Sequence, residues 1–191
     1  MKKWNLVIDI AKCLNCNCCT LACHDEYYDN EFPGYARGMP KHGGNWINIV
    51  QRETGVVPMV EVSYLPTTCN HCDKPPCLAA ARDGAVVKRD DGIVIIVPEK
   101  ARGQRQIVDA CPYGAVHWNE ERQLPQAWPF DAHLLDKGWK RTRGAQSCPT
   151  RAMQVLHVED DEMKRIVAEE GLEVLHPEYG TAPRVYYRNL K

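Results

Sequence analysis

The chain has 191 residues, with 24 Lys and Arg against 25 Asp and Glu, and a formal net charge of −1 at pH 7. This length suits one ordinary domain or two small ones, and the balanced charge excludes the basic bias of proteins that bind nucleic acid non-specifically. No apolar run approaches the ~20 residues of a membrane-spanning helix. Asn5 and Asp9 interrupt the apolar N-terminal stretch, so we expect no membrane insertion, no secretory signal and a cytoplasmic location. The alternative is export alongside a partner that bears a signal.

Residue patterns predict strands in three parts of the chain. Residues 4–10 alternate in polarity and predict a half-buried strand that leads to Cys13. Residues 46–50 and 58–64 predict a pair of strands. Residues 85–97 predict a hairpin, because the Asp-Gly step inside them is typical of a tight turn between strands.

The other segments predict a loop, a helix and a tail. Residues 24–45 are rich in Gly and Pro and predict a loop anchored by three tyrosines, Tyr27, Tyr28 and Tyr35. Residues 161–170 begin with acidic residues and predict a short amphipathic helix that stops at Gly171. We expect the Pro- and Gly-containing residues after it to form an irregular tail that wraps a partner subunit.

The chain has ten cysteines but only two phenylalanines. This unusual composition indicates that the cysteines form disulfides or bind a metal or cluster. Five of them fall within residues 13–23. Disulfides between such near neighbours close tiny loops, stabilise little and are usually strained. Disulfide scaffolds are also typically short and secreted. Thiolates that converge on a metal or a cluster therefore explain the crowding better.

The cysteine spacing favours iron–sulfur clusters. The first run, C-x2-C-x2-C-x3-C, consists of Cys13, Cys16, Cys19 and Cys23. It is typical of bacterial ferredoxins, in which the fourth cysteine binds the other cluster. The second run, C-x2-C-x4-C, consists of Cys69, Cys72 and Cys77. Each run thus offers three thiolates that need a fourth from elsewhere, and Cys111 and Cys148, each followed by proline, fit that role.

Zinc held by four thiolates is the alternative metal. Zinc sites usually pair two C-x2-C knuckles, whereas the three-plus-one arrangement is that of a cubane cluster. His24 and His71 neighbour cysteines of the two runs and could act as alternative ligands. We expect them instead to support the ligand cysteines or to lie at the surface.

The order of the four cysteine blocks resembles the iron–sulfur subunits of molybdopterin oxidoreductases. Over almost all of its length the chain is similar to the small subunits of pyrogallol–phloroglucinol transhydroxylase and resorcinol hydroxylase. The shared stretches are residues 32–35, 91–94, 111–114, 118–121, 132–136, 169–174 and 183–187. The resemblance implies an α+β, double ferredoxin-like fold with loop insertions. Residues 1–157 would form its two nested halves. Residues 158–191 would form a helix and an extended, irregular tail that pack on the partner subunit.

The family carries up to four [4Fe–4S] clusters, and this chain lacks several of the expected ligands. The positions where the family has cysteine hold Ala81, Ala101, Gln104, Ile107, Trp128, Asp131 and Gly144. The missing residues belong together as ligand sets, so the resemblance implies two clusters. The first is held by Cys13, Cys16, Cys19 and Cys148, and the second by Cys69, Cys72, Cys77 and Cys111. Cys23 is left without cluster partners, and Cys18 does not match a ligand position. Asp131 could bind iron in principle, but it lacks thiolate neighbours in the sequence.

By the same resemblance, the chain is a non-catalytic electron-transfer subunit in a heterodimer with a large molybdopterin subunit that acts on polyhydroxylated aromatics. Molybdopterin is expected only in that partner. No Gly-rich phosphate loop, Ser/His/Asp set or His-Glu-x-x-His motif supports catalysis within this chain. There are two alternatives. One is a structural subunit whose clusters mainly stabilise the fold, and the other is a free-standing dicluster ferredoxin.

Overall fold

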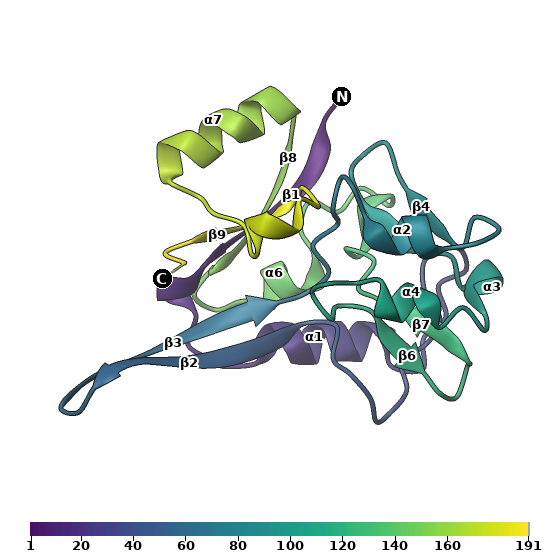
Figure 1. The fold of residues 1–191 in the computed structure, drawn as a ribbon, viewed down its shortest axis with the longest axis horizontal. Helices are drawn as coiled ribbons and strands as arrows, with labels where there is room; N and C mark the ends of the chain where they lie inside the picture. Colours follow the sequence, from purple (N-terminus) through teal and green to yellow (C-terminus); the bar gives the residue numbers. More distant parts are fainter. Residues whose placement is uncertain (191) are drawn as a thin grey trace.

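A three-stranded sheet joins the two ends of the chain. The computed structural model describes residues 1–190 (Figure 1). Strand β1 (Lys3–Asp9) is central, with β8 (Met153–Val158) antiparallel on one side and β9 (Val185–Arg188) parallel on the other. Leu6 and Ile8 of β1 are fully buried, which confirms the predicted N-terminal strand. The expectation of a half-buried strand is wrong, because Asn5 and Val7 on the other face are 0% and 1% exposed.

Three two-stranded hairpins surround this sheet. They are β2 (Asn48–Val56) with β3 (Met59–Thr67), β4 (Val86–Lys88) with β5 (Val94–Ile96), and β6 (His117–Asn119) with β7 (Leu124–Gln126). The first two confirm predicted pairs, although β2 and β3 are longer than expected. The third hairpin was not predicted, because its residues show no strong alternation of polar and apolar side chains. Gly92 turns the second hairpin with a φ of +88°, a conformation that favours glycine.

Most of the helices are short. They are η1 (Ile10–Lys12), α1 (Cys18–Tyr27), α2 (Pro76–Ala80), α3 (Pro98–Ala101), α4 (Gln106–Asp109), α5 (Ala132–Leu135), α6 (Arg143–Ser147), α7 (Asp160–Glu170) and η2 (Pro177–Tyr179). The prediction that a loop begins at residue 24 is wrong, because α1 continues to Tyr27. The Tyr27 ring is fully buried against Phe32 and Trp46, and this packing extends the helix. No helix within residues 1–190 combines the length and apolarity needed to cross a membrane.

The C-terminal segment packs on its own chain. Helix α7 ends at Gly171, as predicted, and the following residues return to pair β9 with β1. Arg184, only 3% exposed, binds both carboxylate oxygens of Asp73 at 2.6 Å and Asp160 at 2.9 Å. The sheet therefore includes residues on both sides of the expected boundary near residue 157. Packing of the outer side of this segment on a partner subunit stays a prediction.

The β2–β3 hairpin projects from the body as a long arm (Figure 1). Three apolar residues at its tip, Val56, Val57 and Met59, are 79%, 86% and 82% exposed. An isolated two-stranded ribbon is marginally stable in water, and exposed apolar patches commonly mark interaction sites.

Candidate iron–sulfur sites

Four cysteines from opposite ends of the chain lie together beside α1 and α6. This first thiol group consists of Cys13, Cys16, Cys19 and Cys148. Cys13 follows η1, Cys19 lies in the first turn of α1, and Cys148 directly follows α6. The two helices pack against each other, and the Ser147 hydroxyl donates a 3.2 Å hydrogen bond to the Cys18 carbonyl oxygen.

The pKa values of the first thiol group reflect this closeness. Burial raises the pKa of Cys13, and the neighbouring charges of Cys148 and Cys16 raise it further. Burial also raises the pKa of Cys19 to about 11. Crowded thiolates repel one another, so a bound cationic metal centre would relieve the repulsion.

Backbone and hydroxyl donors around the first thiol group favour thiolate sulfur. Burial opposes ionisation of Cys148, but donors from Thr150 and from the backbone of residues 150–153 outweigh it and lower the pKa of this thiol. The Ala152 N–H lies 3.2 Å from the Cys148 Sγ. Asn15 and Asn17 have φ values of 53° and 56°, and such left-handed residues turn neighbouring N–H groups into anion-binding concavities.

The other four expected ligands lie together on the opposite side of the molecule. This second thiol group consists of Cys69, Cys72, Cys77 and Cys111. Cys77 lies in α2 and Cys111 follows α4, and these two helices pack against each other. Burial raises the pKa of Cys69 well above its ordinary value, and the charges of the other three thiols add to this.

The donor chemistry of both groups fits an iron–sulfur cluster. Each brings four soft sulfur atoms together, and backbone N–H groups near Cys13, Cys19, Cys69 and Cys77 lower the pKa of those thiols in opposition to burial. Across residues 1–190, no three His, Cys, Asp or Glu side chains are arranged to hold a single metal ion. This finding does not exclude a cubane, because its four thiolates bind different iron atoms and lie farther apart than the ligands of one tetrahedral ion. The two groups differ in exposure: Cys16 is exposed, whereas Cys72 and Cys77 are buried.

The remaining two cysteines have different surroundings. Cys18 lies beside Cys16, and the hydrogen bond between them raises the pKa of Cys18. Cys23 is 2% exposed, and burial raises its pKa well above the ordinary value, followed by the charges of Asp131 and Cys19. Cys23 thus packs inward, against a carboxylate.

A hydrogen-bonded core occupies the region around Cys23. We call it the Asp131 site, formed by Cys23, Tyr27, Trp128, Asp131 and Gly144. Asp131 is fully buried; its Oδ1 accepts from the Tyr27 hydroxyl at 2.7 Å and Trp128 Nε1 at 2.9 Å, and its Oδ2 accepts from the Arg143 backbone N–H at 2.7 Å. Both oxygens therefore already have partners, which argues against Asp131 as an iron ligand.

The second set of missing ligand positions is also packed. We call it the Gln104 site, formed by Ala81, Ala101, Gln104 and Ile107. Ala101 and Ile107 are fully buried. The Gln104 amide accepts from the Arg82 N–H at 2.8 Å and donates to the carbonyl oxygens of Arg82 and Lys100 at 3.2 and 2.9 Å. The Gln104 side-chain amide thus connects the backbone at Arg82 to the backbone at Lys100.

His71 lies between the second thiol group and the Asp131 site. Its Nδ1 accepts a 3.0 Å hydrogen bond from the Val94 N–H, and burial lowers its pKa to about 3. The ring meets Trp128 and Phe130 edge-on, with centroids 5.7 and 5.1 Å away, and its buried Nε2 has no hydrogen-bond partner within residues 1–190. His71 therefore holds the cysteine loop to β5. Sequence reasoning missed this contact, because it depends on a residue 23 positions away.

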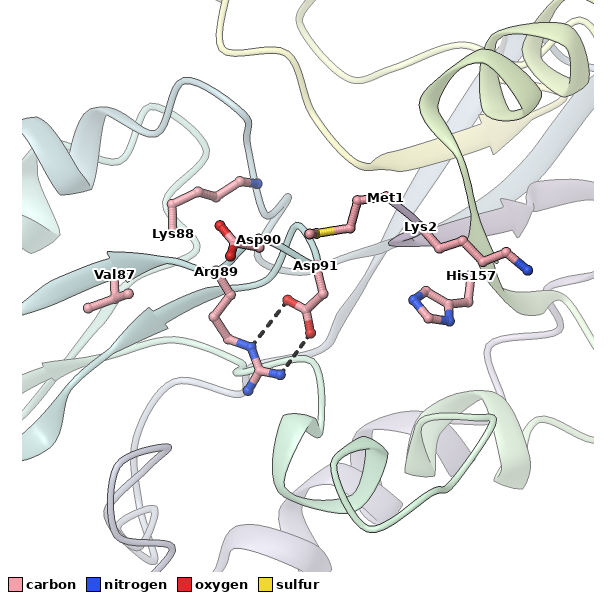
Figure 2. Close-up of a pocket in the computed structure, with 8 residues that line it drawn as sticks. All are labelled: Met1, Lys2, Val87, Lys88, Arg89, Asp90, Asp91 and His157. Atoms are coloured by element: carbon pink, nitrogen blue, oxygen red, sulfur yellow. Dashed lines mark hydrogen bonds and ion pairs between the residues drawn. The ribbon is translucent and has the colours of Figure 1, made fainter.

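One large hollow lies away from both thiol groups. Figure 2 shows its lining residues, and its volume is about 700 Å³. Arg89 pairs with Asp91 there at 2.7 Å, and the other lining residues are Met1, Lys2, Val87, Lys88, Asp90 and His157. No cysteine is among them, so this hollow is separate from the candidate sites.

Comparison with known proteins gives consistent matches. Residues 60–158 match the 4Fe-4S dicluster domain family. The chain is 47% identical over 193 residues to the pyrogallol hydroxytransferase small subunit of Pelobacter acidigallici, covering 100% of the chain and 70% of that relative. It is 32% identical over 192 residues to a tetrathionate reductase subunit from Salmonella typhimurium, covering 98% and 73%. It is 26% identical over 232 residues to the arsenate respiratory reductase iron-sulfur subunit ArrB of a Shewanella species, covering 95% and 94%.

Proposed function

Starting from the fact that this chain belongs to the 4Fe-4S dicluster family, as an iron–sulfur electron-transfer subunit of the molybdopterin-enzyme type, we propose that it carries two [4Fe–4S] clusters. The first thiol group would hold one cluster and the second thiol group the other. The observation that carries this proposal is the grouping of eight cysteines into two sets of four. A cluster bound at such a set supplies one-electron transfer at a potential tuned by burial, charge and hydrogen bonds to sulfur.

The partner in this proposal is a large molybdopterin subunit that acts on polyhydroxylated aromatics, and the two chains form a heterodimer. The 47% identity to a pyrogallol hydroxytransferase small subunit supports the substrate class. The exposed Cys16 and the 67% exposed Leu14 place an accessible surface beside the first thiol group. A surface of this kind suits electron exchange with a partner.

The projecting β2–β3 arm supports an obligate partner rather than a free-standing ferredoxin. Its apolar tip is covered by no other part of residues 1–190, and a hollow of about 410 Å³ separates the arm from the Cys13 loop. A ribbon of this kind gains stability by lying on another surface. We expect the catalytic subunit to contact the arm.

The Asp131 site separates the two thiol groups and supports unequal roles for them. On one side Cys23 is one helical turn from Cys19, and on the other Trp128 meets His71, which lies between two cysteines of the second thiol group. Buried and hydrogen-bonded side chains of the Asp131 site occupy this interval. A transhydroxylation exports no electrons overall, so it tolerates a broken row of clusters. We therefore propose electron exchange with molybdenum at the first thiol group, and mainly a stabilising role at the second.

Iron analysis and rapid-freeze paramagnetic resonance test these proposals. Anaerobically purified protein should contain about eight irons per chain, from two cubanes. Iron near twelve would indicate a third cluster, and one or two zinc ions without visible absorbance would overturn the cluster assignment. After substrate is mixed with the assembled complex, only the first cluster should be reduced at the turnover rate. Reduction of both at that rate would contradict the unequal roles, and absence of a large subunit on purification would favour the free-standing ferredoxin.

A further inference from the structure

Asp131 is a buried carboxylate whose three hydrogen-bond partners are all uncharged. They are the Tyr27 hydroxyl, the Trp128 indole N–H and the Arg143 backbone N–H. The two N–H groups can only donate, so they favour the ionised carboxylate. Burial raises the pKa of Asp131, and the three donors, followed by the charge of the nearby His133, oppose that shift.

The charged groups nearby are paired with each other rather than with Asp131. Glu26 binds the Arg143 guanidinium at 3.0 Å and His133 Nε2 at 2.9 Å. His133 Nδ1 lies 3.4 Å from the Tyr27 hydroxyl, and the ring makes no hydrogen bond or ion pair with Asp131 itself. Arg143 thus gives its cationic end to Glu26 and only its backbone N–H to Asp131. Within residues 1–190, the charge of Asp131 therefore has no cationic partner in an ion pair.

Helix α1 links Asp131 to the first thiol group through Cys23. Cys19, Cys23 and Tyr27 are spaced four residues apart on α1 and share one face. Tyr27 binds Asp131 directly, and the charges of both Asp131 and Cys19 raise the pKa of Cys23. A single thiol therefore separates Asp131 from Cys19. Toward the second thiol group, the Trp128 and His71 rings intervene.

A fixed negative charge in a low-dielectric interior disfavours the addition of an electron to a neighbouring centre. We propose that Asp131 lowers the reduction potential of the cluster at the first thiol group, without binding iron itself. This inference rests on the proposed function, since it requires a cluster there. It assigns Asp131 an electrostatic role at a position where the resembling family has a cluster ligand.

Asp131→Asn in the holoprotein tests the proposal, because the amide keeps the shape and removes the charge. Potentiometric titration followed by paramagnetic resonance should show that the reduction potential of the first cluster rises by about 59 mV. For a one-electron couple, this rise corresponds to about a tenfold change in the reduction equilibrium. The second cluster should not move. A Cys72→Ser background assigns the signals, because it removes a ligand of the second cluster only.

Three further variants control this test. Cys23→Ser replaces one neutral buried side chain by another and should leave the reduction potential of the first cluster unchanged. Asp131→Glu keeps the negative charge and should have a potential close to that of the wild type. If Asp131→Asn loses iron, Asp131→Ser offers a second neutral side chain that still accepts hydrogen bonds. An unchanged potential in a neutral variant with full iron, or an equal shift of both clusters, overturns the role of Asp131. Wild-type protein without about eight irons overturns the proposed function instead.

Discussion

Cys19 and Cys23 lie one turn apart on the same face of α1, yet they enter two different kinds of region. Cys19 belongs to the first thiol group, where four sulfur atoms crowd together. Cys23 belongs to the Asp131 site, where Trp128 and Asp131 are buried and hydrogen-bonded to each other. Beside Cys23 the interior is thus a packed and hydrogen-bonded core rather than a second group of thiols. A buried carboxylate without donors would cost several kcal/mol, on the order of the penalty for an unpaired buried charge.

The largest expected effect is on iron content. Cys148→Ser and Cys72→Ser should each lower iron from about eight to about four per chain, because each removes one ligand of one cubane. The loss also destabilises the surrounding fold, since metal binding energy is folding energy. Iron analysis and circular dichroism measure both effects.

Cys23→Ser and Cys18→Ser are the matched controls for this iron measurement. Both should retain about eight irons, because neither belongs to a proposed ligand set. Equal iron loss from Cys23→Ser and Cys148→Ser would show that the cysteines are paired differently.

The Asp131 site should respond to truncation as a core does. Trp128 is 1% exposed, so Trp128→Ala should lower the free energy of unfolding by about 3–5 kcal/mol through lost packing. Denaturant titration of the anaerobic holoprotein measures this loss. Iron should stay near eight in the folded variant; a loss of under about 1 kcal/mol would show that the region is not a packed core.

Restoring the family's ligands should not restore a cluster. The variant that combines Trp128→Cys, Asp131→Cys and Gly144→Cys completes a set with Cys23. A Cβ at position 144 would lie 3.1 Å from Ile47 Cδ1 and 3.4 Å from Cys19 Cβ, so the added side chain overpacks the α1–α6 contact. We expect iron to stay near eight, and Gly144→Ala alone to cost about 1–3 kcal/mol of stability. Twelve irons would show that only the ligands were missing.

The smallest effect on stability is expected at the arm. Val57→Lys, at an 86% exposed position, should change the free energy of unfolding by less than about 0.5 kcal/mol. It should nevertheless weaken association with the catalytic subunit, about tenfold if the tip residue is an interface anchor. Size-exclusion chromatography at decreasing concentration measures this change. Unchanged association would place the interface elsewhere, and Val87→Lys, at a 41% exposed position on the body, is the control.

Strong local patterns were predictable from the sequence. The N-terminal strand, the β4–β5 hairpin and the helix Asp160–Glu170 follow from alternation, an Asp-Gly turn and a glycine stop. Features that depend on distant contacts were not. The extension of α1 to Tyr27 depends on aromatic packing, and the parallel β1–β9 pair joins residues about 180 positions apart.

The candidate sites show the same limit. Cysteine spacing and family resemblance predict two groups of four cysteines. The thiols of each group are neighbours in the structure, and their role as cluster ligands stays a prediction. The role of Asp131 was not predictable, because its partner Tyr27 lies 104 residues away and its Arg143 contact is made by the backbone. Likewise, nothing in the sequence indicates that His71 accepts from Val94.

The sheet that joins the two ends of the chain has a consequence for biosynthesis. A ribosome releases β1 long before β9, so the central sheet stays incomplete until Arg188 of β9 has emerged. The first thiol group likewise waits for Cys148, whereas all four members of the second are available once Cys111 has been made. The cysteines of the second thiol group are therefore all present well before those of the first, which is complete only once Cys148 has been made.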